Sequence, residues 1–354
     1  MDITIEQAAE DELKEKPDEN KLGFGSIFTD HMLVMAYDDG HWQQPVIKKY
    51  QNFSLDPAAM VLHYGQAIFE GLKAYRGKDD QIYLFRPQDN FHRMNKSAHR
   101  MCMPEINVAE VFNGLQELLR LEKAWVPSVS GATLYIRPTM VATEAGLGVR
   151  PAEQYLFFII LSPVGAYYPE GFNPVTIFVT EKYVRAVPGG VGNAKTAGNY
   201  AASIMAAVEA QDQGFTQVLW LDAVERKYVE EVGTMNIFFV IGDEVITPPL
   251  SGSILPGLTR DSVLRLTRDW GLNVVERRIS IDEVFTAADN GTLREVFGTG
   301  TAAVISPVGA LSYRGNVCKV NSGKTGELAQ RLFDELQEIQ YGLRPDPYGW
   351  VVKI

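Results

Sequence analysis

One lysine of this sequence stands in an unusual setting, within the glycine-rich loop PGGVGNAKTAGNY that runs from Pro188 to Tyr200. Glycine, alanine and asparagine flank Lys195, and residues this small let the backbone approach a ligand closely. A lysine that loses hydration in such a site has the pKa of its ammonium group lowered, which frees an amine to react with a carbonyl compound. The competing interpretation is a lysine in an ordinary flexible loop.

The same loop contains part of the pattern of a phosphate-binding P-loop, G-x-x-x-x-G-K-[ST], between Gly189 and Thr196. Two features weaken this interpretation. Ala194 replaces the second glycine, and Pro188 leads into the loop where a continuous apolar strand is required. The candidate for a metal-holding aspartate, Asp222, follows the lysine by only 27 residues, which leaves little room for the helix and crossover of a parallel sheet.

Three further motifs follow in the second half of the chain. Glu231 opens the segment EVGTMNIF, directly before a predicted strand, where the ordinary interpretation is a solvated edge residue. Leu258 and Thr259 begin a predicted helix, and the N–H groups and positive dipole of a helix start suit a phosphate. The turn GTGTA, from Gly298 to Ala302, offers more N–H groups and hydroxyls, although a simple strand turn is the alternative.

The composition narrows the function classes. With 33 basic and 44 acidic side chains among 354 residues, the net charge of −11 argues against a nucleic-acid-binding surface. Cys102 and Cys318 form no CxxC pair and the five histidines show no ligand spacing, so neither a disulfide framework nor a metal is expected. No secretory signal is visible, and the longest apolar run, Tyr155–Leu161, is too short to span a membrane. We therefore expect a cytoplasmic protein.

The pattern of apolar residues predicts the elements that position these motifs. Strands are predicted at 26–37, at 70–86 as a hairpin turning at 77–80, and at 133–141, 155–161, 175–179, 217–221, 235–241 and 244–246. Helices are predicted at 89–100 with Asp89 as the cap, at 108–125, 200–213, 260–270 with Thr259 as the cap, 280–288 and 324–341. The fold class expected is α/β, with an α+β-like first half.

The length favours two domains, at ~150 residues for each. We expect a solvated acidic arm at 1–20 and a small α/β domain at 21–164. A linker rich in glycine, proline and aromatic residues is expected at 165–174, followed by a larger α/β domain at 175–354.

The span from Glu231 to Arg260 resembles the class IV aminotransferase signature, and the lysine loop resembles that of the branched-chain amino acid aminotransferases. These are pyridoxal-phosphate enzymes of fold type IV. The likeness also includes HYGQAIFEGLKA at 63–74, LFRP at 84–87, LYIRP at 134–138, LGV at 147–149 and SPVG at 162–165. It covers roughly residues 20 to 350. The implied architecture has two α/β domains with the cofactor in the cleft between them.

The resemblance implies roles around pyridoxal 5'-phosphate. Lys195 would form the internal aldimine and then move the proton between the substrate Cα and the cofactor C4′, since one released amine can serve as nucleophile and base. Glu231 would face the pyridine nitrogen and keep the ring an electron sink, and Tyr200 would bond the 3′ oxygen. The other implied cofactor residues are Arg93, Leu258, Thr259, Gly300 and Thr301 at the phosphate, and Thr234 and Asn236 behind Glu231.

The resemblance also implies a substrate site. The α-carboxylate would bind the backbone of Thr301 and Ala302, assisted by Tyr135 and by Tyr64 contributed across a homodimer interface. Arg137 would meet the distal carboxylate of glutamate or 2-oxoglutarate, and an arginine at the pocket rim can engage only the acidic substrate. Phe69, with the two tyrosines, would form the apolar pocket for leucine, isoleucine and valine. Plain core packing is the alternative for these aromatic residues.

The implied activity is a reversible ping-pong transfer of the amino group of leucine, isoleucine or valine to 2-oxoglutarate, giving branched-chain 2-oxo acids and L-glutamate. Residues 303–306 are AVIS, where some animal members carry a redox CxxC, so no thiol switch is expected there. The rivals are a D-amino acid aminotransferase or aminodeoxychorismate lyase of the same fold, and a P-loop nucleotide-binding protein. A non-catalytic binding protein of the same fold is a third, disfavoured because both Lys195 and Glu231 are present.

Overall fold

The computed structural model describes residues 2–165 and 171–354. Two compact units divide the chain. Unit 1 comprises Met1–Tyr167, Ala194–Ala197 and Glu338–Ile354, and unit 2 comprises Tyr168–Asn193 and Gly198–Gln337. The N-terminal arm, the tetrapeptide around Lys195 and the C-terminal segment therefore all group with unit 1. The linker expected at 165–174 lies largely outside the described residues.

Unit 1 is built on a ten-stranded, mainly antiparallel sheet in the order β1-β4-β2-β9-β8-β6-β7-β19, with β3 beside β2 and β5 beside β8. Alternation of buried and partly exposed side chains along β8 is the period-two pattern of a strand with one fully covered face. The strands are β1 Thr4–Ile5, β2 His31–Asp38, β3 His41–Trp42, β4 Val46–Lys49, β5 Ala67–Phe69, β6 Leu72–Arg76, β7 Ile82–Phe85, β8 Thr133–Ala142, β9 Tyr155–Val164 and β19 Val351–Lys353.

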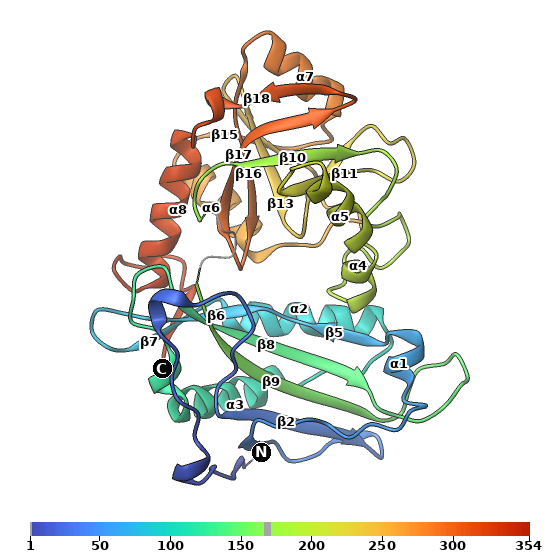
Figure 1. Ribbon diagram of the computed structural model, residues 1–354, viewed down its shortest axis with the longest axis vertical. Helices are drawn as coiled ribbons and strands as arrows, with labels where there is room; N and C mark the ends of the chain where they lie inside the picture. Colours follow the sequence, from blue (N-terminus) through green and yellow to red (C-terminus); the bar gives the residue numbers. More distant parts are fainter. Residues whose placement is uncertain (1, 166–170) are drawn as a thin grey trace. The chain divides into compact units, whose positions relative to one another are not determined.

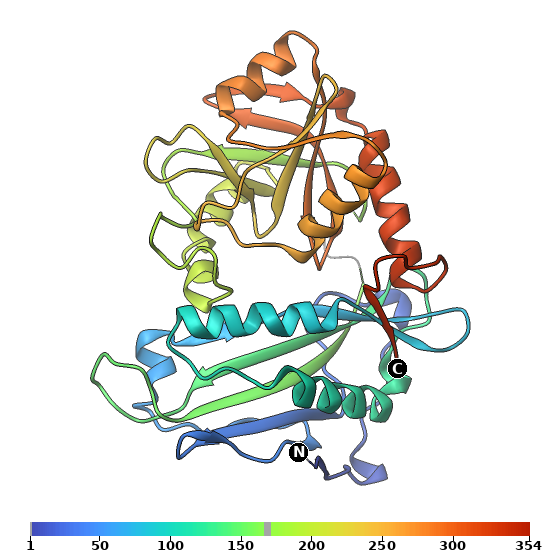
Figure 2. The ribbon, with the colours of Figure 1, turned by 180° about the vertical axis from the view of Figure 1, so that it is seen from behind.

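Two helices, α2 Pro87–Arg100 and α3 Val108–Leu121, cover the same face of this sheet (Figures 1 and 2). Helix α3 lies within the helix predicted at 108–125, and its apolar stripe of Val111, Leu115, Leu118 and Leu119 is buried. A short helix, α1 Met60–Tyr64, precedes β5 and ends at Gly65, which takes a left-handed conformation. Single-turn 3₁₀ helices lie at Glu10–Glu12, Glu19–Lys21 and Lys123–Trp125.

Unit 2 contains a nine-stranded mixed sheet in the order β12-β11-β10-β17-β16-β13-β14-β15, with β18 beside β17. Strand β10 pairs in parallel with both β11 and β17, whereas β16 pairs antiparallel with β13 and β17. The strands are β10 Val175–Thr180, β11 Gln217–Leu221, β12 Val229–Val232, β13 Asn236–Ile241, β14 Glu244–Thr247, β15 Asn273–Glu276, β16 Leu293–Gly300, β17 Val304–Tyr313 and β18 Asn316–Lys319.

The helices of unit 2 include α5 Ile204–Asp212, which packs on β11, and α7 Ile281–Asp289, which packs on β16 and β18. α6 Leu258–Asp269 packs on β15 and β16. The division between the units falls within α4 Ala197–Ala201 and α8 Glu327–Gln340, and a 3₁₀ turn lies at Asn321–Gly323. No helix within residues 2–165 and 171–354 is both long and apolar enough to cross a membrane.

Three local predictions are wrong. Asp89 does not cap α2: the helix begins at Pro87 after Arg86, whose φ is 53°, and Asp89 pairs with the Arg86 Nε at 2.6 Å. Thr259 lies in the first turn of α6, which Gly257 precedes as N-cap. The helix expected at 200–213 is two helices, because the Ser203 hydroxyl bonds the Tyr200 carbonyl at 2.7 Å, a local bond that competes with helical pairing.

The residues of the acidic arm are mostly exposed to solvent, and the arm is also anchored to unit 1. β1 pairs in parallel with β4, and the Ala8 N–H donates to the buried His31 Nε2 at 2.9 Å. The other ring nitrogen of His31 pairs with Glu122, and burial raises the pKa of that carboxyl. Lys14 donates its backbone N–H to Asp30 at 2.9 Å. These buried polar partners require specific geometry, which a charge count cannot reveal.

Candidate active site

The lysine loop is joined to the sheet of unit 1 immediately around Lys195. Its carbonyl accepts the Phe69 N–H at 3.0 Å, and its own N–H donates to the Ser97 Oγ on α2 at 2.9 Å. Thr196 forms an isolated bridge with Ile68. The lysine is thereby fixed on both sides by backbone bonds, and its Nζ lies 4.9 Å from the centre of the Phe69 ring. A flexible surface loop would show none of these constraints.

Arg93 is held by a buried carboxylate that sequence reasoning missed. Its Nε and Nη2 each bond one oxygen of Glu70 at 2.8 Å, the bidentate geometry that is strongest for this pair. The side chains of Arg93 and Glu70 are 7% and 0% exposed. Arg93 precedes Ser97 by one helical turn, so α2 presents both toward the region of Lys195. The signal in the sequence was the charged Glu70 at the start of the strand hairpin predicted at 70–86.

Tyr135 and Arg137 alternate along β8 and therefore share one face of the sheet with Phe69. The guanidinium carbon of Arg137 lies 4.9 Å from the Phe69 ring centre and 5.2 Å from the Tyr135 ring centre, and its Nη2 donates to the Tyr135 Oη at 3.3 Å. Its Nε is buried with no hydrogen-bond partner among the described residues. A side chain at Gly71 would put Cβ 2.0 Å from the Tyr135 Oη, so only glycine fits there. The Arg137 guanidinium therefore lies beside two aromatic rings, and its Nε–H is a donor that a ligand could use.

Tyr64 is more exposed than Phe69, Tyr135 and Arg137. It ends α1, is 43% exposed, and donates its hydroxyl to the carbonyl of Leu147. Leu147 and Val149, in the loop that follows β8, are 73% and 86% exposed. This leaves an aromatic hydroxyl and two large apolar side chains together at the surface of unit 1.

In unit 2, Glu231 lies on β12 and is 3% exposed. Its Oε1 accepts from the Asn236 Nδ2 at 3.0 Å and from the Leu255 N–H at 3.3 Å, and its Oε2 pairs with the Nε of Arg185. Three donors surround the carboxylate, which favours its ionised form. The predicted neighbourhood of Glu231 and Asn236 is present, whereas Arg185 was not predicted because nothing in its local sequence marks it.

Tyr200 and Thr234 come together beside that arginine. A small cavity of about 10 Å³ is lined by Arg185, Asn199, Tyr200, Ser203, Gly233, Thr234 and Leu255. Both predicted residues therefore border one small cavity of unit 2, although they come from opposite sides of β11 in the sequence.

The N-terminus of α6 lies next to Asn236. The Asn236 Nδ2 donates to the Leu255 carbonyl at 2.9 Å, which holds the chain that leads into the helix. A Cβ added to Gly257 would lie 2.0 Å from the Asn236 Oδ1, so this close approach needs glycine. Gly257 has no side chain to cap the helix, so Leu258 and Thr259 form an end suited to an anion.

The predicted turn at Gly300, Thr301 and Ala302 joins β16 to β17. Asn236 on β13 stands opposite Thr299, so the turn begins beside the Asn236 end of that strand. Val304, which closes the turn, has φ of 62°, a conformation that costs a β-branched residue about 1–2 kcal/mol. Strain of this kind persists only where surrounding structure over-determines it, and it is a frequent property of binding turns.

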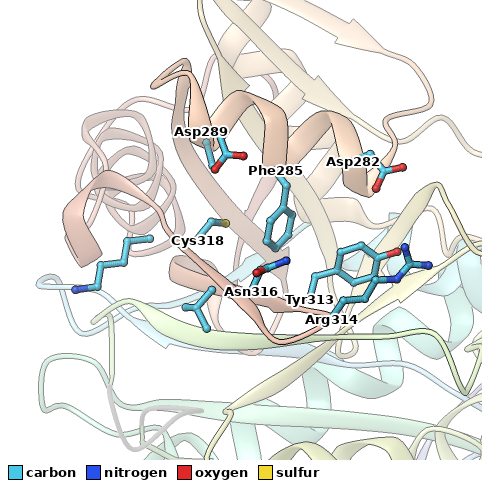
Figure 3. Close-up of a pocket in the computed structure, with 10 residues that line it drawn as sticks. Asp282, Phe285, Asp289, Tyr313, Arg314, Asn316 and Cys318 are labelled. Carbon is cyan, nitrogen blue, oxygen red and sulfur yellow. The ribbon is translucent and has the colours of Figure 1, made fainter.

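A larger pocket, of about 660 Å³, lies elsewhere in unit 2, between α7 and the β17–β18 hairpin (Figure 3). Asp282, Phe285 and Asp289 line it from the helix, and Tyr313 and Cys318 from the hairpin. It contains no predicted site residue. Burial raises the pKa of the Cys318 thiol, and Cys102 is an exposed free cysteine. In the part of the chain that the structure describes, no group of His, Cys, Asp and Glu could hold a metal ion.

Comparison with known proteins decides between the competing interpretations of the loop. Residues 67–311 match the family model described as amino-transferase class IV.

The chain belongs to the class IV aminotransferases.

This membership sets aside the P-loop nucleotide-binding interpretation. The structure agrees, since residues 181–196 contain no strand and lead into a five-residue helix. Among curated relatives, the branched-chain-amino-acid aminotransferase 2 of Bacillus subtilis is 54% identical over 96% of this chain and 94% of its own. The branched-chain-amino-acid transaminase 1 of the same organism is 53% identical over the whole of both chains.

Solved structures of class IV aminotransferases share the fold. The branched-chain amino acid aminotransferase of Escherichia coli superposes with a TM-score of 0.75 at 26% identity, covering 91% of this chain and 98% of its own. The T.th. branched-chain amino acid aminotransferase, solved with pyridoxamine 5'-phosphate, gives a TM-score of 0.73 at 28% identity over 90% of this chain and 97% of its own. The predicted α/β fold and family are therefore confirmed.

The residues of this class IV aminotransferase fit its cofactor, pyridoxal phosphate. The buried carboxylate of Glu231 would suit a protonated ring nitrogen, and the uncapped N-terminus of α6 beside Asn236 would suit a phosphate. Lys195 and Arg93 of unit 1 would supply the amine and a further cation. The set contains each kind of donor and acceptor that the ring, the aldehyde and the phosphate need.

Proposed function

We propose that this enzyme is a branched-chain amino acid aminotransferase that transfers the amino group of leucine, isoleucine or valine to 2-oxoglutarate. The observation that carries the proposal is the trio of Phe69, Tyr135 and Arg137 on one face of the unit 1 sheet. Its rings offer apolar surface to an aliphatic side chain, and its guanidinium offers a partner to the distal carboxylate of the acidic substrate. The names of the two Bacillus subtilis relatives, both branched-chain amino acid aminotransferases, support the same substrates.

Each predicted site residue keeps its proposed role. Lys195 binds the cofactor covalently and then moves the proton at the substrate Cα, for which its fixed backbone provides a defined reach. The cofactor, when bound, supplies a ring that stabilises negative charge at that carbon. Glu231 holds a proton at the ring nitrogen and Tyr200 binds the ring oxygen. The phosphate is assigned to Arg93, Leu258, Thr259, Gly300 and Thr301, with Thr234 and Asn236 beside Glu231.

The α-carboxylate is assigned to the backbone of Thr301 and Ala302, with Tyr135 and Tyr64. For Tyr64 we propose that it serves the second copy in a homodimer. Its exposure, together with that of Leu147 and Val149, supports an interface there, because large apolar side chains gathered at a surface favour burial against a partner. On unit 2, α5 exposes Ile204, Met205 and Val208 by 60%, 58% and 45%. Both cysteines are free thiols, which supports the cytoplasm as location.

The test begins with the absorption spectrum of the purified protein. A yellow band that bleaches with leucine and returns with 2-oxoglutarate is expected, as is its absence from Lys195→Ala. Turnover of D-alanine without leucine would favour the D-amino acid aminotransferase instead. A protein that stays colourless with added pyridoxal phosphate would overturn the proposal and favour a non-catalytic role.

The role of Arg137 has its own test, because the two half-reactions differ in the need for a cation. Arg137→Met is expected to retain bleaching by leucine and to slow recovery with 2-oxoglutarate by about 10–100-fold, as expected for a charged hydrogen bond of about 1.5–3 kcal/mol. Arg120→Met, which removes an exposed arginine paired with Glu117 on α3, is the matched control. Equal loss in both half-reactions would contradict the assignment.

A further inference from the structure

Arg185 links three segments of unit 2 through one guanidinium. Its Nε pairs with Glu231, its Nη1 donates to the Ser253 carbonyl at 3.1 Å, and its Nη2 donates to the Gly192 carbonyl at 3.1 Å. The side chain is 9% exposed. Gly192 precedes Lys195 by three residues, and Ser253 begins the approach to Leu255 and α6.

The close packing at Gly192 shows that this arrangement is specific. A Cβ there would lie 2.2 Å from the Ser253 carbonyl oxygen and 2.6 Å from the Ala186 Cβ. Two carbonyl oxygens therefore converge on one arginine, at a spacing that only glycine permits. Because a planar guanidinium presents donors in a rigid fork, lysine cannot reproduce all of these bonds.

The charge of Arg185 bears on what Glu231 can do. The arginine stays protonated, and at this degree of burial its field is only weakly screened by water. A carboxylate that is paired with a buried cation is a weaker base than the same carboxylate beside neutral donors alone. Glu231 can then face a protonated ring nitrogen without removing its proton.

We propose that Arg185 is a positioning residue of the transaminase. It keeps Glu231 ionised and weakly basic, and it links that carboxylate to the segment that leads to Lys195 and to the segment that leads to α6. The inference rests on the proposed function. Without the charge of Arg185, Glu231 competes for the proton of the ring nitrogen. With pyridoxal phosphate bound, its ring would accept less negative charge. The Lys195 nitrogen joined to it would hold its proton to higher pH, because the ring would be more electron-rich and one cation fewer would lie nearby.

The decisive measurement is the pH titration of the yellow absorbance of the enzyme loaded with pyridoxal phosphate. Arg185→Gln removes the charge and keeps amide donors, and we expect its midpoint about one pH unit above that of the wild type, a tenfold change in proton affinity. Its kcat for leucine is expected to fall about 10-fold or more, with a smaller change in KM. The matched control is Arg277→Gln, which removes a cation paired with Glu283 and Glu244 away from these residues.

Arg185→Lys tests the charge separately from the hydrogen bonds, because lysine keeps the positive charge but lacks the planar set of guanidinium donors. It is expected to keep the wild-type midpoint and to lose cofactor faster on dilution, because the Gly192 and Ser253 carbonyls lose donors. A midpoint that moves up by a full unit in Arg185→Lys, or one that does not move in Arg185→Gln, would overturn the proposal and leave Arg185 a purely structural residue. If Arg185→Gln does not retain cofactor, the lysine variant decides alone. A colourless wild type would instead refute the proposed function.

Discussion

The buried pair of Glu70 and Arg93 gives a prediction that separates folding from cofactor binding. Glu70→Gln replaces the carboxylate by a neutral amide of the same shape and leaves the Arg93 cation 7% exposed with one acceptor fewer. Breaking one side of a buried ion pair destabilises a protein by about 3–5 kcal/mol. That is a large share of a typical total of about 5–15 kcal/mol. We expect the free energy of unfolding to fall by an amount in this range.

The double variant Glu70→Met with Arg93→Met gives the opposite expectation. Well-packed apolar side chains in place of a buried pair are often neutral or stabilising. We therefore expect the double variant to unfold within about 1 kcal/mol of the wild type, while it binds pyridoxal phosphate far more weakly because the phosphate has lost Arg93. Single and double variants form a cycle whose coupling energy isolates the pair.

The assay is urea unfolding without and with saturating pyridoxal phosphate, since a ligand that binds only the folded state adds its own stabilisation. Cofactor affinity is measured separately by absorbance titration. A loss below about 1 kcal/mol in Glu70→Gln, or additive losses in the double variant, would refute the reasoning that the pair is coupled and desolvated. Unchanged cofactor affinity in the double variant would refute the phosphate role of Arg93 alone.

Three more predictions concern other parts of the chain. Burial lowers the pKa of Lys73 to about 8, from 10.5 in the unfolded chain. Because the unfolded chain then binds this proton more tightly, the free energy of unfolding should rise with pH between about 8 and 10.5. Lys73→Met should flatten that rise when urea midpoints are measured across this pH range. Gly257→Ala should weaken cofactor binding at least about 10-fold, because its Cβ would meet an oxygen 2.0 Å away, whereas Gly23→Ala, with 3.8 Å of clearance, should bind normally in the same titration. His31→Phe removes the acceptor of a backbone N–H in the N-terminal arm, so limited proteolysis within residues 2–20 should be faster. An unchanged rate would mean that the other contacts of the arm, such as the β1–β4 pairing and the Lys14–Asp30 bond, anchor it without His31.

Most elements were predictable because their cause is local. The hairpin of β6 and β7, the stripe of α3 and the turn around Gly242 follow from periodicity and turn chemistry, and the structure has all three. Helix starts were less predictable. The N-caps of α2 and α6 were wrongly assigned because Arg86 in a left-handed conformation and Gly257 beside Asn236 reflect neighbours distant in the chain.

The sequence by itself determined the family, the lysine in its glycine-rich loop and the acidic residue before β13, since these depend on residue type and order. Only the tertiary structure decided which charges meet. Glu70 reaches Arg93 because β5 and α2 pack together in unit 1, and Glu231 reaches Arg185 because β12 and the segment after β10 lie in one unit. Pairing of this kind is set by strand order and burial, which place residues distant in sequence at hydrogen-bonding distance. Local sequence patterns do not indicate which residues distant in the chain come within hydrogen-bonding distance of one another.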